Sequence, residues 1–161
     1  MSKVIVISGG FDPPHEGHTR YIIEAEKLGD KLIVILNSDE FLDKKKAELG
    51  GRFYRDIDER REILQWGLGI RFGRKSEIID CIDNDMTVAR TLELIRQKYP
   101  NDEIIFAKGG DRKDETSLPD EEVMVCGRYD IEMRFGVGGF SKPQSSSWLL
   151  ERYKTGKTAK Q

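Results

Sequence analysis

The 161-residue chain has little cysteine and no long apolar run, and both absences exclude classes of protein. Its two cysteines, Cys81 and Cys126, lack the paired spacing of a metal or redox centre, so we expect two buried free thiols. No segment approaches the roughly 20 apolar residues of a membrane-spanning helix, and the apolar start is too short for a signal peptide. The sequence therefore predicts a soluble, cytoplasmic protein without a membrane partner.

The chain also lacks an excess of charge of either sign. Lys and Arg number 27 against 29 Asp and Glu, which gives a formal net charge of −2. This balance excludes a strongly basic protein, and we expect no nucleic-acid partner. The charge is uneven, however, because residues 44–75 hold ten basic and five acidic residues. A local basic region of this kind suits a small phosphorylated ligand rather than a long polyanion.

Runs of apolar, largely β-branched residues predict strands that are buried on both faces. The clearest runs are Lys3–Ser8, Leu32–Leu36 and Glu103–Ala107, with shorter ones at Ile78–Ile82 and Ile131–Phe135. Strands that alternate with helices along the whole chain predict a three-layer α/β domain with a mainly parallel five-stranded sheet. In such sheets, ligands bind at the carboxyl ends of the strands.

Apolar residues at helical spacing predict the intervening helices. The charged stretch from Lys44 to Asp58 has no apolar period, and we interpret it as a long loop or broken helix. We expect one domain over residues 1–153 and a disordered tail over 154–161. The expected helices cover Glu16–Leu28, a segment that begins at the capping box of Asp56 and Glu59, Val88–Tyr99 before Pro100, Pro119–Tyr129 and Ser145–Tyr153.

Both histidines lie in one loop, directly after the first strand. The loop reads Ser8-Gly9-Gly10-Phe11-Asp12-Pro13-Pro14-His15-Glu16-Gly17-His18. His15 and His18 are three residues apart at the start of a helix, which puts them on one face. The helix N-terminus and the glycines favour a bound phosphate, and the imidazoles add movable donors. Metal ligation and a purely structural role are the alternatives, but no third His or Cys supports a closed zinc site.

This loop resembles the H-x-G-H signature of the nucleotidylyltransferase superfamily, which includes cytidylyltransferases and small adenylyltransferases. Further segments carry the resemblance in order along the chain. Asn37–Phe41 with Lys44–Lys46, and Glu59-Arg60, are similar to glycerol-3-phosphate cytidylyltransferases; Lys108–Asp111 resembles a loop of heptose-1-phosphate adenylyltransferases, and Ser145–Ser147 the Ser/Thr-rich second signature.

The resemblance implies a Rossmann-like, commonly dimeric domain. Its members transfer a nucleotidyl group from a nucleoside triphosphate to a phosphorylated small molecule and release pyrophosphate. For this chain we expect a phosphorylated polyol or sugar as acceptor, CTP slightly preferred over ATP, and Mg²⁺ held mainly by phosphates and water. The alternatives are an ATP-dependent adenylyltransferase of the sugar-1-phosphate type and, from another class, a non-catalytic nucleotide-binding module.

The resemblance also implies roles for individual residues. A solvated face is the alternative for the lysines, a tight turn for Lys108–Asp111, and helix capping alone for the serines. The segment Gly50–Arg55 matches none of these relatives, and we interpret it as a lid over the acceptor. The implied catalytic residues are His15, His18, Lys46 and Arg60; nucleotide-binding residues are Gly9, Gly10, Phe11, His15, His18, Lys108, Gly109, Gly110, Asp111, Ser145, Ser146 and Ser147; acceptor-binding residues are Asp12, Asp39, Lys44, Lys46 and Arg60.

Overall fold

Five parallel strands form one sheet in the order β3-β2-β1-β4-β5. The computed structural model describes residues 2–12, 14–48, 50–110 and 112–139. The register is continuous across the centre, where Val6 of β1 pairs with Ile33 of β2 and with Phe106 of β4. The α/β fold with a five-stranded, all-parallel sheet is thus confirmed. The strands are β1 (Lys3–Gly9), β2 (Lys31–Leu36), β3 (Ser76–Asp80), β4 (Glu103–Gly109) and β5 (Ile131–Val137).

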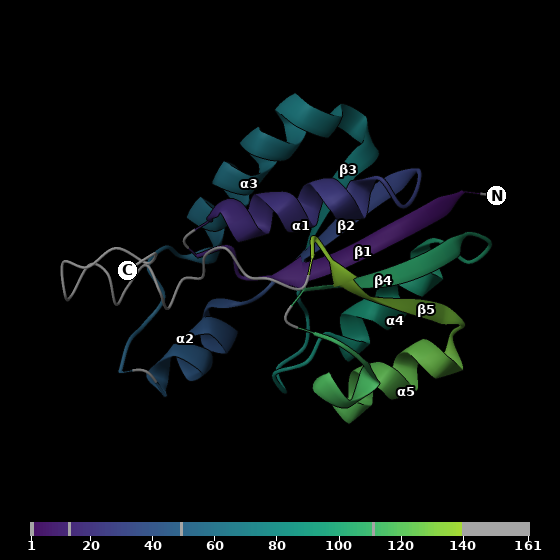
Figure 1. Cartoon of the computed structure of the whole chain (residues 1–161). Helices are drawn as coiled ribbons and strands as arrows, with labels where there is room; N and C mark the ends of the chain where they lie inside the picture. The colour runs from purple at the N-terminus through teal and green to yellow at the C-terminus, as the bar shows by residue number, and fades with distance from the viewer. Residues whose placement is uncertain (1, 13, 49, 111, 140–161) are drawn as a thin grey trace.

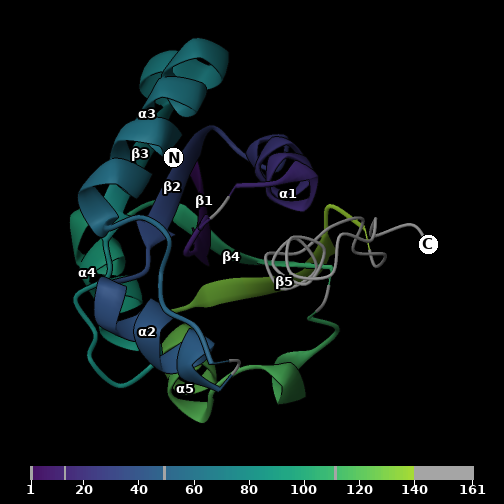
Figure 2. The same ribbon diagram turned by 90° about the vertical axis from the view of Figure 1, so that its left-hand side faces the viewer.

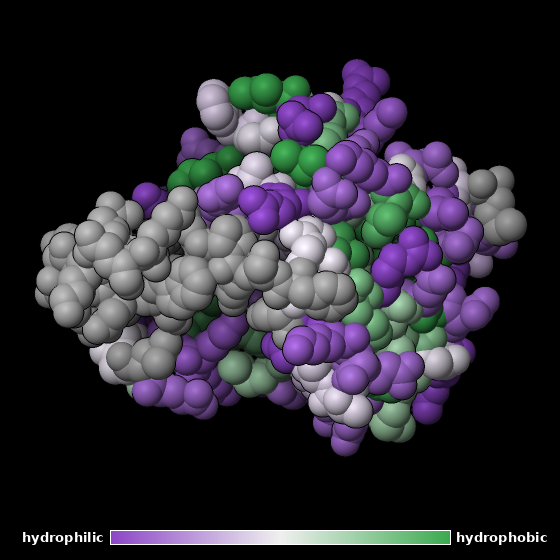
Figure 3. All heavy atoms as spheres, viewed as in Figure 1, coloured by the Kyte–Doolittle hydropathy of each residue, from purple (hydrophilic) through white to green (hydrophobic). Residues whose placement is uncertain are grey.

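Helices cover both faces of the sheet, which gives three layers (Figures 1 and 2), and Figure 3 shows the surface of the same view. Alternate residues of β1 point to opposite faces, so Ile5 and Ile7 join one buried cluster, and Val4 and Val6 the other. The first cluster includes side chains of α1 and α3, and the second includes side chains of α4 and α5. The helices are α1 (Glu16–Glu26), α2 (Asp39–Ala47), α3 (Ile57–Phe72), α4 (Ala89–Lys98) and α5 (Asp120–Arg128), with short 3₁₀ turns at Gly73–Lys75 and Glu115–Ser117.

Of the two interpretations of the charged stretch, the long loop is wrong for its first part, whereas a broken helix agrees with the end of α2 at Ala47 and the start of α3 at Ile57. Lys44 and the next two lysines lie in α2, which begins at the N-cap Ser38, whose side chain accepts a hydrogen bond from the Phe41 N–H. Leu42 is the buried residue of this helix. A helix is predicted from apolar residues that recur every three or four positions. Because α2 buries one side chain, the sequence shows no such repeat there. The capping box is confirmed, since the Asp56 side chain accepts from the Glu59 N–H at the start of α3.

Both cysteines are free, but only one of them is buried. Burial and the nearby Glu122 carboxyl raise the pKa of the Cys126 thiol to about 12. Cys81 is half-buried, so the expectation of two buried thiols holds for one residue. Among the described residues, no helix has the length and apolar character needed to cross a membrane. The expected helix Ser145–Tyr153 and the tail over 154–161 lie outside the described residues.

Candidate active site

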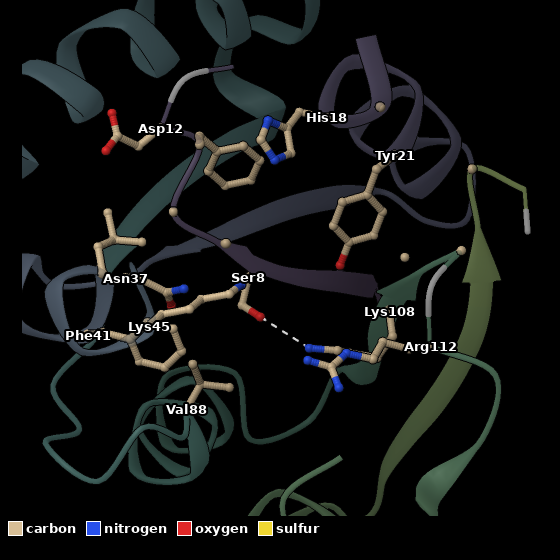
Figure 4. A pocket seen from close by; sticks show the side chains of 18 of the residues that line it. Ser8, Asp12, His18, Tyr21, Asn37, Phe41, Lys45, Val88, Lys108 and Arg112 are labelled. Atoms are coloured by element: carbon tan, nitrogen blue, oxygen red, sulfur yellow. Dashed lines mark hydrogen bonds between the residues drawn. The ribbon is translucent and has the colours of Figure 1, made fainter. Parts of the chain in front are cut away.

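A cavity of about 360 Å³ opens at the carboxyl ends of β1 and β4, the two strands where the order of the sheet reverses (Figure 4). Gly9 and Gly109 are the last residues of β1 and β4, and Gly10 and Gly110 follow them directly; all four line the cavity. The fold therefore brings together two of the loops that the sequence singles out. The remaining wall includes residues from α1, from α2, from the segment before α4, from the segment between β4 and α5, and from the end of β5.

His15 and His18 stand on one wall of this cavity, at the beginning of α1. Their rings are stacked, with centroids 3.7 Å apart and an interplanar angle of 21°. The Phe11 ring packs edge-on against His18 at 4.9 Å. These contacts fix the orientation of both imidazoles on the lining of the cavity. We use the name histidine wall for His15, His18, Lys46 and Lys108 together, which line the cavity from α1, from α2 and from the end of β4.

Two glycines are required by close packing beside the cavity. A Cβ at Gly10 would lie 2.5 Å from Leu42 Cδ2, so a side chain here would displace α2 or its leucine. Gly138, after β5, has φ +88° and lies against α1, where a Cβ would meet the Tyr21 Cα at 3.1 Å. Phe11 adopts a left-handed φ of 52°, which is uncommon for a residue with a side chain. The main chain at the end of β1 is thus held in a specific, costly conformation.

Asp12 joins the first loop to the segment Gly50–Arg55. Its buried carboxylate accepts hydrogen bonds from the Tyr54 N–H at 2.6 Å, the Arg55 N–H at 3.0 Å and Lys46 Nζ at 2.9 Å. Lys46 Nζ also donates to the Asp12 carbonyl and lies 4.9 Å from the centre of the Tyr54 ring. In this arrangement the carboxylate organises protein groups, and in Figure 4 it points away from His18 and Tyr21. The segment Gly50–Arg55, which we interpret as a lid, is therefore held by hydrogen bonds to the loop that carries the histidines.

Arg60 is placed differently from the expectation that it grips the acceptor. Its side chain is fully buried, and it does not line the cavity. The guanidinium donates to the carbonyls of Arg55 and Gly10 at 3.0 Å, and to the Asn37 carbonyl at 2.9 Å. It also donates to Asp39 Oδ1 at 2.8 Å. We call this cluster of Arg60, Asp39 and the three carbonyls the Arg60 junction; it holds together the chain segments behind the cavity.

The lysines of α2 are divided between the cavity and the surface. Lys45 and Lys46 line the cavity, whereas Lys44 is exposed and lies outside its lining. On the opposite side, Lys108 Nζ donates to Ser8 Oγ at 3.4 Å (Figure 4). Cations thus face the cavity from α2 and from the end of β4. Asp39, Arg60 and Lys44 were all predicted to bind the phosphorylated acceptor, but none of them lines the cavity.

Several lining residues were not predicted from the sequence. Tyr21 lies one turn after His18 on α1, and its hydroxyl donates to the Ala107 carbonyl. The series His15, His18, Tyr21 at a spacing of three was the available signal. Arg112 lines the cavity and donates to the Ser117 carbonyl, without any motif to mark it. The other unpredicted lining residues include Asn37, Phe41, Leu42, Met86, Val88, Leu118, Glu122, Val137 and Gly138.

Glu122 is a buried acid at the start of α5 and on the cavity lining. Its Oε2 accepts from the Val88 N–H at 3.1 Å, which ties α5 to the start of α4. Its Oε1 is buried and receives no hydrogen bond from the described residues. Desolvation raises the pKa of this carboxyl, although the charges of Lys108 and Arg112 act in the opposite direction. Burial at the edge of the cavity therefore disfavours the ionised form of this side chain.

Four predicted site residues, Asp111, Ser145, Ser146 and Ser147, lie outside the described residues. Their assignment to the nucleotide stays a prediction.

Comparison with known proteins identifies the family. The cytidylyltransferase-like family matches residues 6–124. Two curated relatives, each named bifunctional protein HldE, are 34% identical over 154 residues (Photobacterium profundum) and 32% identical over 157 residues (Vibrio cholerae serotype O1). Each match covers 96% of this chain but 28% of the relative, so the chain spans little more than a quarter of their length.

Two solved structures share the fold. A bifunctional NMN adenylyltransferase/ADP ribose pyrophosphatase from Francisella tularensis aligns with a TM-score of 0.67 at 18% identity, over 100% of this chain and 44% of that one. The lipopolysaccharide core biosynthesis protein from Thermoplasma volcanium GSS1 aligns with a TM-score of 0.56 at 22% identity, over 89% and 100% of the two chains. The family match over residues 6–124 places the chain in the cytidylyltransferase-like family of nucleotidylyltransferase enzymes.

Proposed function

We propose that the chain transfers an adenylyl group from ATP to a phosphorylated sugar and releases pyrophosphate. The observation that carries this proposal is the stacked pair His15 and His18, which opens α1 in the same cavity as Lys46 and Lys108. Displacement at a phosphorus atom depends on positioning and on stabilisation of charge rather than on a covalent nucleophile. A wall of donors and cations beside a glycine-lined main chain meets that need.

ATP replaces CTP as the favoured nucleotide. From the sequence alone, CTP is slightly preferred, and the sugar-1-phosphate adenylyltransferase is the alternative. The similarity to HldE over 96% of this chain supports that alternative better. It agrees with the resemblance of Lys108–Asp111 to heptose-1-phosphate adenylyltransferases. The family match leaves the non-catalytic alternative with little support.

In the proposed reaction, an oxygen of the acceptor phosphate attacks the α-phosphorus, and the bond to the bridging oxygen of pyrophosphate breaks. His15 and His18 donate hydrogen bonds to the phosphates as negative charge develops on the leaving group. The N–H groups of Gly10 and Phe11 hold the nucleotide beside β1. Lys46 attracts the phosphate of the acceptor. Arg60 and Asp12 act indirectly, because they hold the loops that carry these groups.

A metal ion in this site would arrive with the triphosphate rather than be held by protein side chains. Among the described residues, no group of three or more His, Cys, Asp or Glu side chains could hold a metal ion. The Asp12 carboxylate is buried and already accepts three hydrogen bonds. We therefore propose that Mg²⁺ is bound by phosphate oxygens and water, a mode of binding that suits this ion. Its chemistry when bound is neutralisation of triphosphate charge.

Pyrophosphate release tests the proposed function. Purified protein is incubated with ATP or CTP and, in separate reactions, with heptose and hexose 1-phosphates or glycerol 3-phosphate. We expect release with ATP and a sugar 1-phosphate, and none with the nucleotide alone. Release with CTP and glycerol 3-phosphate only would reverse the choice of substrates. If no combination releases pyrophosphate but ATP still raises the melting temperature of the protein, a non-catalytic nucleotide-binding module is favoured.

A further inference from the structure

Two buried side-chain oxygens on the cavity lining receive no hydrogen bond from the part of the chain that the structure describes. They are Asn37 Oδ1 and Glu122 Oε1, and the two residues are 7% and 5% exposed. A buried polar atom without a partner destabilises the folded protein, and most buried polar atoms are paired. Two such acceptors in one cavity therefore indicate a ligand that supplies hydrogen-bond donors.

The contacts that these two residues make within the fold do not use either oxygen. The Asn37 N–H donates to the Gly9 carbonyl at 3.0 Å, and the Asn37 carbonyl accepts from Arg60 at 2.9 Å. Glu122 accepts from the Val88 N–H through its other oxygen, Oε2. Packing and main-chain bonding thus explain the position of both residues but not the presence of a further acceptor on each.

The two oxygens belong to the side of the cavity away from the histidines. Val88, which donates to Glu122, lies in the buried cluster that includes side chains of α4 and α5, whereas Tyr21 packs against the cluster on the opposite face of the sheet. In Figure 4, Asn37, Phe41 and Val88 lie on one side of the end of β1, and His18 and Tyr21 lie on the other. The proposed triphosphate site occupies the histidine side, which leaves this second side for the other substrate.

The chemistry of this second side suits a sugar better than a phosphate or a base. Phe41, Val88 and Leu118 add apolar surface beside the two oxygens. Hydroxyl groups can donate to both oxygens, while the C–H groups of a sugar ring pack on apolar and aromatic side chains. Ionised phosphate oxygens are acceptors and cannot pair with either oxygen. Adenine offers one amine donor group, whereas the two acceptors come from the end of β2 and from α5.

The loop before α4 holds one more lining residue, Met86, in a fixed conformation. Its φ of 66° is costly for a residue with a side chain, and such conformations persist where the surrounding structure imposes them. The Asp85 carboxylate accepts from the Thr87 N–H at 3.2 Å and from the Thr87 hydroxyl at 2.7 Å. Buried Asp83 accepts from the Thr91 N–H at 3.0 Å. These bonds shape the apolar surface in advance of a ligand, which lowers the cost of binding.

We propose that Asn37 and Glu122 are specificity-determining residues that accept hydrogen bonds from hydroxyl groups of the sugar in the phosphorylated acceptor. Phe41 and Val88 pack against the ring, and Lys46 attracts the phosphate. This inference rests on the proposed function, which makes the acceptor a sugar phosphate. A site built to bond a hydroxyl rejects an analogue that lacks it, because the buried oxygen is then left unpaired.

Calorimetric titration tests the proposal with a heptose 1-phosphate, mannose 1-phosphate, glucose 1-phosphate and inorganic phosphate. Each is titrated with Mg²⁺, without nucleotide and with α,β-methylene-ATP. We expect at least one sugar phosphate to bind about tenfold or more tightly than inorganic phosphate, which has no hydroxyl-bearing ring.

Substitutions at the two acceptors should affect the sugar and not the phosphates. Asn37→Ala and Glu122→Gln should each weaken binding of that sugar phosphate about five- to tenfold, the usual effect of one hydrogen bond, with the dissociation constants of inorganic phosphate and α,β-methylene-ATP unchanged. Asn101→Ala and Glu121→Gln, at exposed positions outside the cavity lining, are the matched controls and should bind as the wild type does. Circular dichroism of each variant verifies that it is folded.

The outcomes separate this inference from the proposed reaction. Wild-type protein that binds no sugar phosphate more tightly than inorganic phosphate, or variants that bind the sugar phosphate normally, would overturn the inference. Variants that lose affinity for α,β-methylene-ATP instead would also overturn it, since the oxygens would then bind the nucleotide. Selective loss of sugar-phosphate binding, in a protein that releases no pyrophosphate, would support these two residues and contradict the reaction.

Discussion

The Arg60 junction and the histidine wall both carry positive groups beside the first loop, but they use them in opposite ways. Arg60 is 1% exposed, and its guanidinium donates to four protein oxygens. Lys46 is held by Asp12 yet remains on the cavity lining, as does Lys108. A buried cation whose donors all meet protein acceptors stabilises the fold, whereas a cation on the lining can exchange a protein acceptor for a phosphate. Position in the fold, rather than residue type, decides between these roles.

Removal of the junction cation should give the largest effect. We expect Arg60→Ala to lower the free energy of unfolding by about 3–5 kcal/mol, because Asp39 and three carbonyl groups lose a buried donor. Urea denaturation measures this change. The matched control is Arg61→Ala, since the neighbouring Arg61 forms more exposed ion pairs with Asp58 and Asp80 and should change stability by less than about 1 kcal/mol. Equal effects of the two substitutions would remove the distinction between junction and surface.

Removal of a donor from the histidine wall should affect turnover rather than folding. We expect His18→Ala to reduce the turnover number by about 10² to 10³, the usual result of losing a donor to developing charge. Arg20→Ala is the control on the same helix, since Arg20 is exposed and pairs with Glu16. Initial rates of pyrophosphate release measure both variants. Wild-type turnover by the His18 variant would contradict the assignment.

Lys46 belongs to the histidine wall but also donates to the buried Asp12 carboxylate, and its substitution should therefore have an intermediate effect. We expect Lys46→Met to raise the KM for the phosphorylated acceptor about tenfold or more and to leave the KM for ATP nearly unchanged. Lys44→Met, two residues earlier on α2 and outside the cavity lining, should leave both values unchanged. If Lys44→Met raises the KM for the acceptor as much as Lys46→Met does, the effect comes from general charge attraction and not from direct contact between Lys46 and the acceptor phosphate.

The smallest effect is expected at Glu122, which shares features of both regions. Burial raises the pKa of this carboxyl in the folded state, so the folded chain binds its proton more tightly than the unfolded chain. The contribution of Glu122 to stability is therefore highest at low pH and falls as pH rises through the folded-state pKa. Glu122→Gln keeps an oxygen for the Val88 N–H and should remove this dependence.

Unfolding free energies of the wild type and Glu122→Gln, measured from pH 4 to pH 8, check this prediction. The difference should grow in favour of the variant as pH rises. Glu121→Gln, at the exposed neighbouring position, should follow the wild type. A constant difference across the range would mean that Glu122 does not titrate differently in the folded and unfolded chains.

The sequence predicted the regular part of the fold because buried strands and one-sided helices leave a periodic signal. Strand β1, helix α4 and the cap at Asp56 lie where the pattern indicates. The two loops on the cavity were found because glycine and histidine are concentrated there. The Arg60 junction could not be predicted, since three of its acceptors are main-chain carbonyls from residues 10, 37 and 55, which no side-chain pattern marks. Helix α2 was missed because it buries one residue.

The place of β1 in the sheet also has a consequence for how the chain is synthesised. β1 pairs with β2 on one edge and with β4 on the other, and Lys3 lies opposite Glu103. While the ribosome has yet to release β4, the second edge of Val4–Ile7 has no partner in the emerging chain. An open edge on such an apolar strand favours association between nascent chains. The proposed phosphate site lies at the ends of both β1 and β4, so it can form only after β4 has left the ribosome.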